Sequence, residues 1–401
     1  MPKVIPMVFP GSATLAEEDM AQYFNFRVES AEGYWGRAGF LRKWWRIYAD
    51  DSRWAPPAWT RLRQAVVAKQ FAHLERSRPQ YMVVEALPRR RQANVSNQSF
   101  PNINQGLMME EPVAAAIVLI DPRRTDSTAH LAMLHAANNR ESLERLLHAV
   151  QEQVGHEGIR RVVLPVGLSP YLGTGVLQDQ FHREPPLHAP YAPPYVPELF
   201  STVCRPLGRS LLYTMEAGAH RDRRAAVAGP AVIHPLDPDR LADDLLPLFS
   251  QSVPAWADFP LPDGVEAQFL LWWILRRPAL AWLAEVDGKA VGFLLAQPDG
   301  SGPLRRSRGG RSLLGRLLLQ CLELRQPRSV RILFMGVDQD YRRRGIGRQL
   351  WQKMLSAGPA NGWETVTAGP LPSTARAGSG FLKAVGLSSR ETYLLHRYDF
   401  D

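Results

Sequence analysis

The fold of this chain is decided by one stretch, Val337-Asp338-Gln339-Asp340-Tyr341-Arg342-Arg343-Arg344-Gly345-Ile346-Gly347-Arg348. It joins an apolar, strand-like run at 329–337 to residues 347–355, where apolar side chains return at helical spacing. Glycines let backbone N–H groups approach phosphate oxygens, and a helix N-terminus with four nearby arginines adds positive charge. The stretch predicts a pyrophosphate-binding loop. The alternative is a basic helix start on a solvated surface, and the strand before the loop favours the first interpretation.

Outward from this loop, the second half of the chain alternates between strand-like and helical patterns. Strands are expected at 231–236, 279–286, 290–298, 329–337, 363–369 and 391–398, and helices at 241–249, 265–277, 312–324, 347–355 and 373–385. The dipeptide Asp287-Gly288 favours a tight hairpin turn between two of these strands. The first half has a weaker version of the same order, which indicates an internal duplication. Its expected strands are 3–9, 81–87, 113–120, 130–135 and 161–166, and its expected helices are 38–48, 57–76 and 140–154.

The two halves are separated by a small-residue and charged stretch, AGAHRDRRAAVAGP at 217–230, which has no apolar periodicity. We therefore expect one domain at 1–217, a linker at 218–229 and a second domain at 230–401. A polar insertion at 88–111 interrupts the first hairpin and is expected to be mobile.

Composition bounds the class of protein. The chain has 401 residues, of which 45% are apolar, and this is enough for two globular domains that each bury a core. Its only cysteines, Cys204 and Cys321, allow neither a disulfide framework nor a cysteine-based zinc site, and we expect no metal. Apolar runs such as 267–275 are far short of the ~20 residues that span a bilayer, and the start has no export signal. A cytoplasmic protein is expected.

The pattern V-x-x-x-x-R-R-x-G-x-G, after an antiparallel hairpin, resembles the acetyl-CoA signature R/Q-x-x-G-x-G/A of the GNAT acyltransferase superfamily. The resemblance covers 231–398. It implies an α/β (α+β) fold with two tandem GNAT-like domains, each a mixed, largely antiparallel sheet flanked by helices. It also implies acetyl-CoA or another acyl-CoA as cofactor. The cofactor-binding residues that it implies are Val337, Arg342, Arg343, Arg344, Gly345, Ile346, Gly347 and Arg348, with the backbone of Val337 at the pantetheine and thioester.

The first half carries a second, finer resemblance. The stretches 41–48 (LRKWWRIY), 54–57 (WAPP) and 190–195 (PYAPPY) are similar to those of a group of uncharacterised bacterial proteins with two GNAT-like halves. Where a phosphate loop would lie, the first half has no glycine at 135–141, and Glu141 would repel phosphate. We therefore expect this half to be a scaffold or a substrate wall.

Acyl transfer from a thioester to an amine needs an oxyanion donor, a base for the amine and an acid for the leaving thiolate. The backbone N–H of Val337 or its neighbour is the expected donor. Many GNAT enzymes use a tyrosine where this chain has Leu382, which cannot donate a proton. The candidates that remain are the bases Asp338, Glu364 and His234 and the acids Tyr341, Tyr393 and His396, of which we select Asp338 and Tyr393.

Arg331 stands six residues before Val337, where a carboxylate base is frequent in the family. A guanidinium stays protonated, so Arg331 cannot act as a base, but it can hold a carboxylate or phosphate of the acceptor. The alternative is an arginine paired to a structural acid.

These observations predict an acyl-CoA-dependent N-acyltransferase that acts on a small-molecule or peptide amine. The amine acceptor, for which Arg331 leaves an anionic molecule open, is expected in a groove between the halves. One alternative is a catalytically inactive protein that binds or senses CoA. The other is aminoacyl transfer from charged tRNA, which the net charge of +9 permits without requiring, and we do not expect nucleic acid as a partner.

The proline-rich segment at 182–199 is either a rigid lid over a cleft or a structural wrap. The basic run and apolar helix within 302–331 either contact an anionic membrane surface, dock a partner or, as is more frequent, pack on the protein's own sheet.

Overall fold

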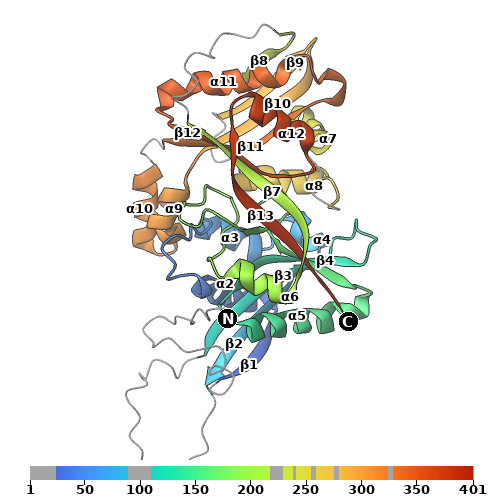
Figure 1. The fold of residues 1–401 in the computed structure, drawn as a ribbon, viewed down its shortest axis with the longest axis vertical. Coiled ribbons are helices and arrows are strands. Elements are labelled where there is room, and N and C mark those ends of the chain that lie inside the picture. Colours follow the sequence, from blue (N-terminus) through green and yellow to red (C-terminus); the bar gives the residue numbers. More distant parts are fainter. Residues whose placement is uncertain are drawn as a thin grey trace, which may run out of the picture.

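A single mixed sheet runs through both halves of the chain in the computed structural model (Figure 1). The structure describes residues 24–88, 110–216, 229–237, 241–253, 259–274, 280–323 and 328–400. The strand order is β1-β2-β3-β4-β5-β13-β7-β12-β11-β10-β9-β8, and β6 pairs with β13 outside this path. The strands are β1 (Phe24–Ala31), β2 (Gln80–Pro88), β3 (Glu111–Leu119), β4 (Thr128–Ala136), β5 (Arg161–Val166), β6 (Val176–Leu177), β7 (Arg205–Glu216), β8 (Val232–Pro235), β9 (Ala281–Val286), β10 (Lys289–Pro298), β11 (Ser329–Val337), β12 (Thr365–Pro372) and β13 (Ser388–Asp399).

Helices cover both faces of this sheet. In the first half α5 and α6 lie against one face and α2 against the other, and in the second half α11 and α12 lie opposite α7 and α8. The helices are α2 (Gly33–Ile47), α3 (Trp59–Val66), α4 (Ala72–Arg76), α5 (Arg140–Val154), α6 (Val196–Val203), α7 (Leu246–Ser252), α8 (Gly264–Ile274), α9 (Ser301–Arg306), α10 (Leu313–Glu323), α11 (Ile346–Asn361) and α12 (Arg376–Ala384).

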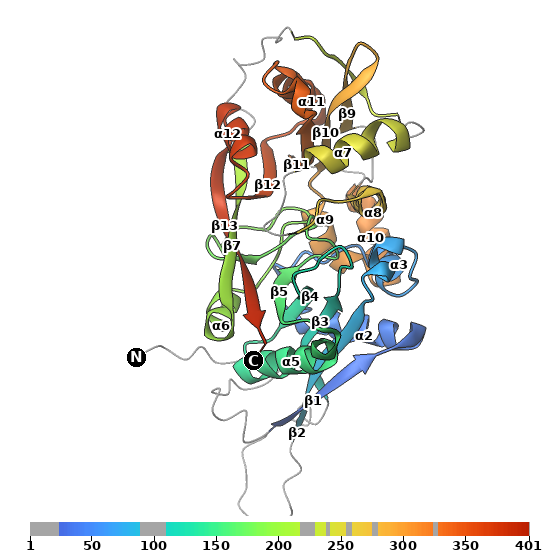
Figure 2. The ribbon, with the colours of Figure 1, turned by 90° about the vertical axis from the view of Figure 1, so that its right-hand side faces the viewer.

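The last strand of each half pairs with a strand of the other half (Figures 1 and 2). Strand β7 pairs with β12 of the second half, while β13 pairs with β5 of the first half, and β7 and β13 pair with each other. The strand order is therefore the same when read from either end, with β1 to β5 matching β8 to β12. This symmetry supports an internal duplication, and the sheet is continuous across the expected boundary. The division at 217 and 230 stays a prediction.

The halves also share a hydrophobic core. One cluster of buried side chains joins Trp44 and Trp45 of α2 to Phe269 and Trp273 of α8. Its aromatic contacts include Phe71 against Phe269, with ring centroids 5.2 Å apart. Because burial of large aromatic rings dominates packing energies, this cluster stabilises the contact between the two halves.

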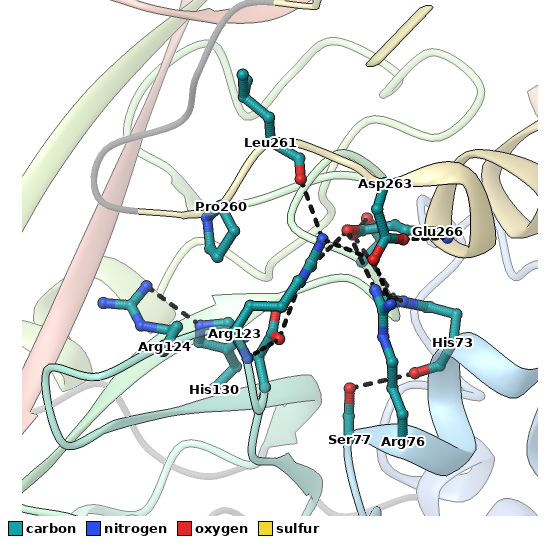
Figure 3. A network of polar contacts seen from close by, with 12 residues as sticks. His73, Arg76, Ser77, Arg123, Arg124, His130, Pro260, Leu261, Asp263 and Glu266 are labelled. Atoms are coloured by element: carbon teal, nitrogen blue, oxygen red, sulfur yellow. Dashed lines mark hydrogen bonds and ion pairs between the residues drawn. The ribbon is translucent and has the colours of Figure 1, made fainter. Parts of the chain in front are cut away.

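A buried polar network reinforces the same interface (Figure 3). Glu266 of α8 is 0% exposed, and its carboxylate accepts hydrogen bonds from Ser169 Oγ and Arg123 Nη2, each at 2.7 Å. His73 Nε2 of α4 lies 3.8 Å from the same carboxylate, and Arg76 of α4 pairs with Asp263. A buried carboxylate is tolerated only when it is paired, so these first-half side chains are needed to keep Glu266 in place.

Several expectations fall outside the described residues or differ from the structure. The strand expected at 3–9, the core of the insertion at 88–111 and most of the linker lie outside the described residues. The helix expected at 57–76 is two helices, α3 and α4. Strands β1, β6 and β7 were not expected. β1 is a partly exposed edge strand, and Pro206 and Gly208 interrupt the strand pattern of β7.

Helix α10 does not pack on the sheet, so that expectation is wrong. It contacts α9 and the turn at 308–310, and Gly315 is its only buried residue. Leu313, Leu314, Leu317 and Leu318 are exposed, by 73%, 77%, 52% and 44%. No helix within the described ranges is long and apolar enough to cross a membrane.

Candidate functional site

A cleft opens where the parallel strands β11 and β12 separate. Their register runs from Ser329 opposite Thr365 to Ile332 opposite Ala368 and then ends. The cleft that follows has a volume of about 960 Å³. Its walls are residues 331–337 of β11, 368–372 of β12, the start of α11, one side of α12 and the end of α7. The first half contributes residues 170–174 and His188, so the cleft lies between the halves.

The loop quoted at the outset forms one end of this cleft. The backbone φ is 85° at Gly345 and 62° at Arg343, so the chain turns sharply just before α11 begins at Ile346. A Cβ added to Gly347 would meet Phe381 Cε2 at 3.3 Å, so a glycine there keeps the wall of the cleft open. A turn of this kind before a helix N-terminus is suited to an anion, because the first N–H groups of a helix have no partner within it.

Most of the residues that the signature implied line the cleft. They are Val337, Arg342, Arg343, Gly345, Ile346, Gly347 and Arg348. Arg344 does not line it. Its guanidinium lies 5.0 Å from the centre of the Tyr341 ring. Arg342 Nε donates a hydrogen bond of 3.1 Å to the carbonyl of Val337, which ties the loop to the strand before it.

The cleft is strongly basic. Among its described lining residues there is no carboxylate, whereas five arginines line it: Arg331, Arg342, Arg343, Arg348 and Arg376. A site of this charge favours a ligand with several negative charges, and the phosphates of an acyl-CoA fit it. The open wall at Gly347 and the edge of β11 that β12 leaves unpaired suit the pantetheine arm of the same molecule.

The two selected proton-transfer residues do not lie in the cleft. Asp338 Oδ1 accepts a hydrogen bond from the N–H of Asp340, and its other oxygen lies 3.5 Å from Lys289 Nζ. The N–H of Asp338 donates to Val291, so this neighbour of Val337 is not a free oxyanion donor. Tyr393 is 0% exposed and donates a hydrogen bond of 2.9 Å to Glu391. Neither side chain is among the residues that line the cleft.

The other candidate acids and bases differ in whether they line the cleft. His234 pairs with Glu285, Glu364 pairs with Arg328, and His396 is buried against Phe200. Tyr341 alone among them lines the cleft. His188 and Ser252, which were not among the expected site residues, also line it. The one available signal was the proline-rich segment: His188 belongs to it and covers part of the cleft.

The equivalent cleft of the first half, between β4 and β5, is filled by aromatic side chains. The His135 ring stacks on the rings of both Trp44 and Tyr48, with centroids 4.0 Å apart in each case. At the end of β4 the N–H of Ala136 donates to Tyr48 Oη and its carbonyl accepts from Tyr195 Oη. The remaining cavity is about 150 Å³. The side chain of Asn139 caps α5 where the second half has its glycine loop.

Comparison with known proteins agrees with this geometry. Residues 242–378 match the acetyltransferase (GNAT) family. A solved tandem GNAT protein from the clavulanic acid biosynthesis pathway is 12% identical, with a TM-score of 0.55 over 93% of this chain and 98% of that one. The GCN5-related glucosamine N-acetyltransferase region of a fungal multi-domain GH3 β-N-acetylglucosaminidase is 13% identical, with a TM-score of 0.52 over 98% of this chain and 40% of that one. No match to the chain was found among curated protein sequences.

The chain is thus an α/β protein with the tandem GNAT fold, and residues 242–378 of its second half match the acetyltransferase (GNAT) family. The expected fold class and the resemblance to the superfamily are confirmed.

Proposed function

We propose that this protein is an acyl-CoA-dependent N-acyltransferase. Its second half binds the acyl-CoA, and the amine acceptor enters the cleft from the side of the first half. The family match and the tandem GNAT fold support acyl transfer in general. The observation that carries the proposal is the cleft itself, where a glycine turn at the start of α11 meets five arginines and no carboxylate among the described lining residues.

The residues that would hold an acyl-CoA follow from their positions. The backbone from Arg343 to Arg348 would bind the pyrophosphate, and the edge of β11 that β12 leaves unpaired, up to Val337, would bind the pantetheine. Edge N–H and C=O groups pair readily with an extended amide chain. When bound, the acyl-CoA supplies an activated thioester.

Two side chains are placed to move protons. His188 carries an imidazole and Tyr341 a phenol hydroxyl, and both side chains line the cleft. Tyr171 also lines it but donates its hydroxyl to the carbonyl of Pro260. Histidine is the most frequent general base in enzymes, and His188 is the base we propose for the amine. Tyr341 is the acid we propose for the leaving thiolate.

A CoA-binding sensor is the second candidate, because one observation favours it. Leu382 lines the cleft where many GNAT enzymes have a tyrosine. The sensor binds acetyl-CoA but transfers nothing, whereas the enzyme releases a free thiol in the presence of an amine.

The test is thiol release from acetyl-CoA across a panel of primary amines, with His188→Gln and His182→Gln as a matched pair. His182 lies in the same proline-rich segment but is exposed and outside the cleft lining. Loss of a general base costs about 10²–10⁴-fold in rate. We expect this loss, together with the acidic limb of the pH–rate profile, in His188→Gln alone. Binding of acetyl-CoA by the parent with no thiol release for any amine would favour the sensor.

A further inference from the structure

Arg331 is a buried cation at the deep end of the cleft. It precedes Ile332, the last residue of β11 in register with β12, and it is 2% exposed. One nitrogen, Nη2, donates to the carbonyl of Gly369. Its Nε and Nη1 atoms have no hydrogen-bond partner among the described residues, and the side chain forms no ion pair with any of them. The N–H groups at Nε and Nη1 are therefore two charge-assisted donors where Arg331 lines the cleft.

The neighbouring strands place polar groups beside it. Gln297 of β10 and Thr367 of β12 lie directly opposite Arg331 in register, so the three side chains share one face of the sheet. Gln297 and Thr367 are each 7% exposed. Within the described part of the chain, Gln297 Oε1 and Thr367 Oγ1 also have no hydrogen-bond partner. Unpaired buried polar atoms are rare, and a row of them marks a place for an absent partner.

The nearby acids are already engaged. Asp299 Oδ1 accepts hydrogen bonds from the N–H groups of Leu187 and Ser301. Glu391 accepts the hydroxyl of Tyr393. Burial lowers the pKa of Arg331, and Asp299, Tyr393 and Glu391 offset this only at a distance. A buried guanidinium without an ion pair is costly, and a ligand carboxylate is the group that offsets this cost best.

We propose that Arg331 is a carboxylate-binding residue of the cleft, which takes a carboxylate carried either by the amine acceptor or by the acyl group of the acyl-CoA. The assignment rests on the proposed function for its place in a reaction. Arg331 lies six residues before Val337, where the thioester is expected, which is up to roughly 20 Å between Cα atoms along β11. The bound carboxylate is therefore several bonds away from the reacting carbon, and an acceptor of this kind is an ω-amino acid or a short peptide rather than an α-amino acid.

The first experiment compares the parent with Arg331→Met and with the control Arg390→Met, whose arginine is exposed on β13 and outside the cleft lining. Acetyl-CoA affinity and the melting temperature are measured with and without glutarate. We expect Arg331→Met to raise the melting temperature of the free protein, because it removes an uncompensated buried charge. We also expect glutarate to stabilise the parent and Arg390→Met but not Arg331→Met, while the acetyl-CoA Kd stays within about twofold. A lower melting temperature for Arg331→Met together with lost acetyl-CoA binding would make Arg331 a purely structural residue and overturn the proposal.

The second experiment identifies which molecule carries the carboxylate. One arm compares 4-aminobutyrate, 6-aminohexanoate and triglycine with their amides, all with acetyl-CoA. The other arm compares succinyl-CoA with acetyl-CoA on a neutral amine. A preference of at least about tenfold in one arm, lost in Arg331→Met, is expected from charge-assisted hydrogen bonds. A preference in the first arm assigns the carboxylate to the acceptor, and one in the second arm assigns it to the acyl group. Equal rates in both arms would overturn the proposal.

Failure of the proposed function has a different signature. In that case the parent releases no thiol with any amine. The glutarate measurement still decides the matter: stabilisation of the parent that Arg331→Met abolishes supports the carboxylate site, and equal responses overturn it.

Discussion

The hydroxyl of Tyr195 donates a hydrogen bond of 2.9 Å to the backbone carbonyl of Ala136, at the end of β4. The hydroxyl of Tyr48 accepts the N–H of the same residue. In the second half the matching end of β11 lines an open cleft instead. Side chains of the first half thus occupy the backbone groups that a pantetheine would need.

Acetyl-CoA is therefore expected to bind once per chain. The 150 Å³ cavity between β4 and β5 is too small for the ligand that the cleft of about 960 Å³ receives. Isothermal titration with acetyl-CoA gives the stoichiometry directly. Two sites per chain would show that the stacked side chains of Trp44, Tyr48 and His135 move apart to admit the ligand.

Replacing Glu266 with glutamine is expected to destabilise the whole protein by about 3 kcal/mol, because it leaves Arg123 without its buried partner across the two halves. Urea unfolding measures the effect, and the shared core predicts a single transition. Glu144→Gln is the control, since the Arg140–Glu144 pair lies on the surface of α5 and is worth under about 1 kcal/mol. Similar losses in both variants would mean that the network in Figure 3 does not join the halves.

Stability is expected to fall with pH below about 6.5, the ordinary pKa of histidine. Burial lowers the pKa of His130 and His135 to about 3 and that of His396 to about 4. Between these values and 6.5 the unfolded chain binds protons that the folded protein does not, so the free energy of unfolding rises with pH in this window and levels off above it. Each group contributes up to about 1.4 kcal/mol per pH unit.

The check is urea unfolding at several pH values between 5 and 6.5, on the parent and on His135→Phe. In His135→Phe the slope of the unfolding free energy against pH is expected to be smaller by the contribution of one histidine. An unchanged slope would mean that His135 is charged in the folded protein, against its stacked position between Trp44 and Tyr48.

Tyr393→Phe is expected to lower stability by about 1 kcal/mol, because Glu391 loses its buried hydrogen bond. Its kcat/KM is expected to match the parent, since Tyr393 lies outside the cleft lining. Steady-state thiol release and thermal unfolding measure the two effects. A large loss of kcat at unchanged stability would return Tyr393 to the role of catalytic acid.

Local sequence signals predicted the strand, turn and helix start of the loop before α11. A strand, a glycine turn and a helix start lie within Val337 to Arg348, and no distant contact is needed to form them. The place of Arg331 in the site was predicted from its position six residues before Val337 on the same strand. Its burial and its unpaired nitrogens depend on the strand pairing with β10 and β12, so no sequence pattern could show them.

The parts that depend on distant contacts were missed. The exchange of β7 and β13 is set by pairing between residues far apart in the chain, such as Thr365 with Glu216. His188 reaches the cleft because the first half folds against the second, and a lone histidine among prolines carries no signal of its own. Asp338 and Tyr393 were selected for residue type alone, and the backbone places both outside the cleft lining.

The central claim is that the turn before α11 holds the pyrophosphate of an acyl-CoA. Isothermal titration with acetyl-CoA on the parent, Gly347→Glu and Gly380→Glu tests it most directly. Both substitutions put the same charge on a helical glycine, but Gly347 lines the cleft, whereas an added Cβ at Gly380 would meet nothing within 4 Å. The account predicts submillimolar binding by the parent and Gly380→Glu and loss of at least about tenfold in affinity for Gly347→Glu, since a carboxylate there repels phosphate. Equal affinity in all three proteins would contradict it.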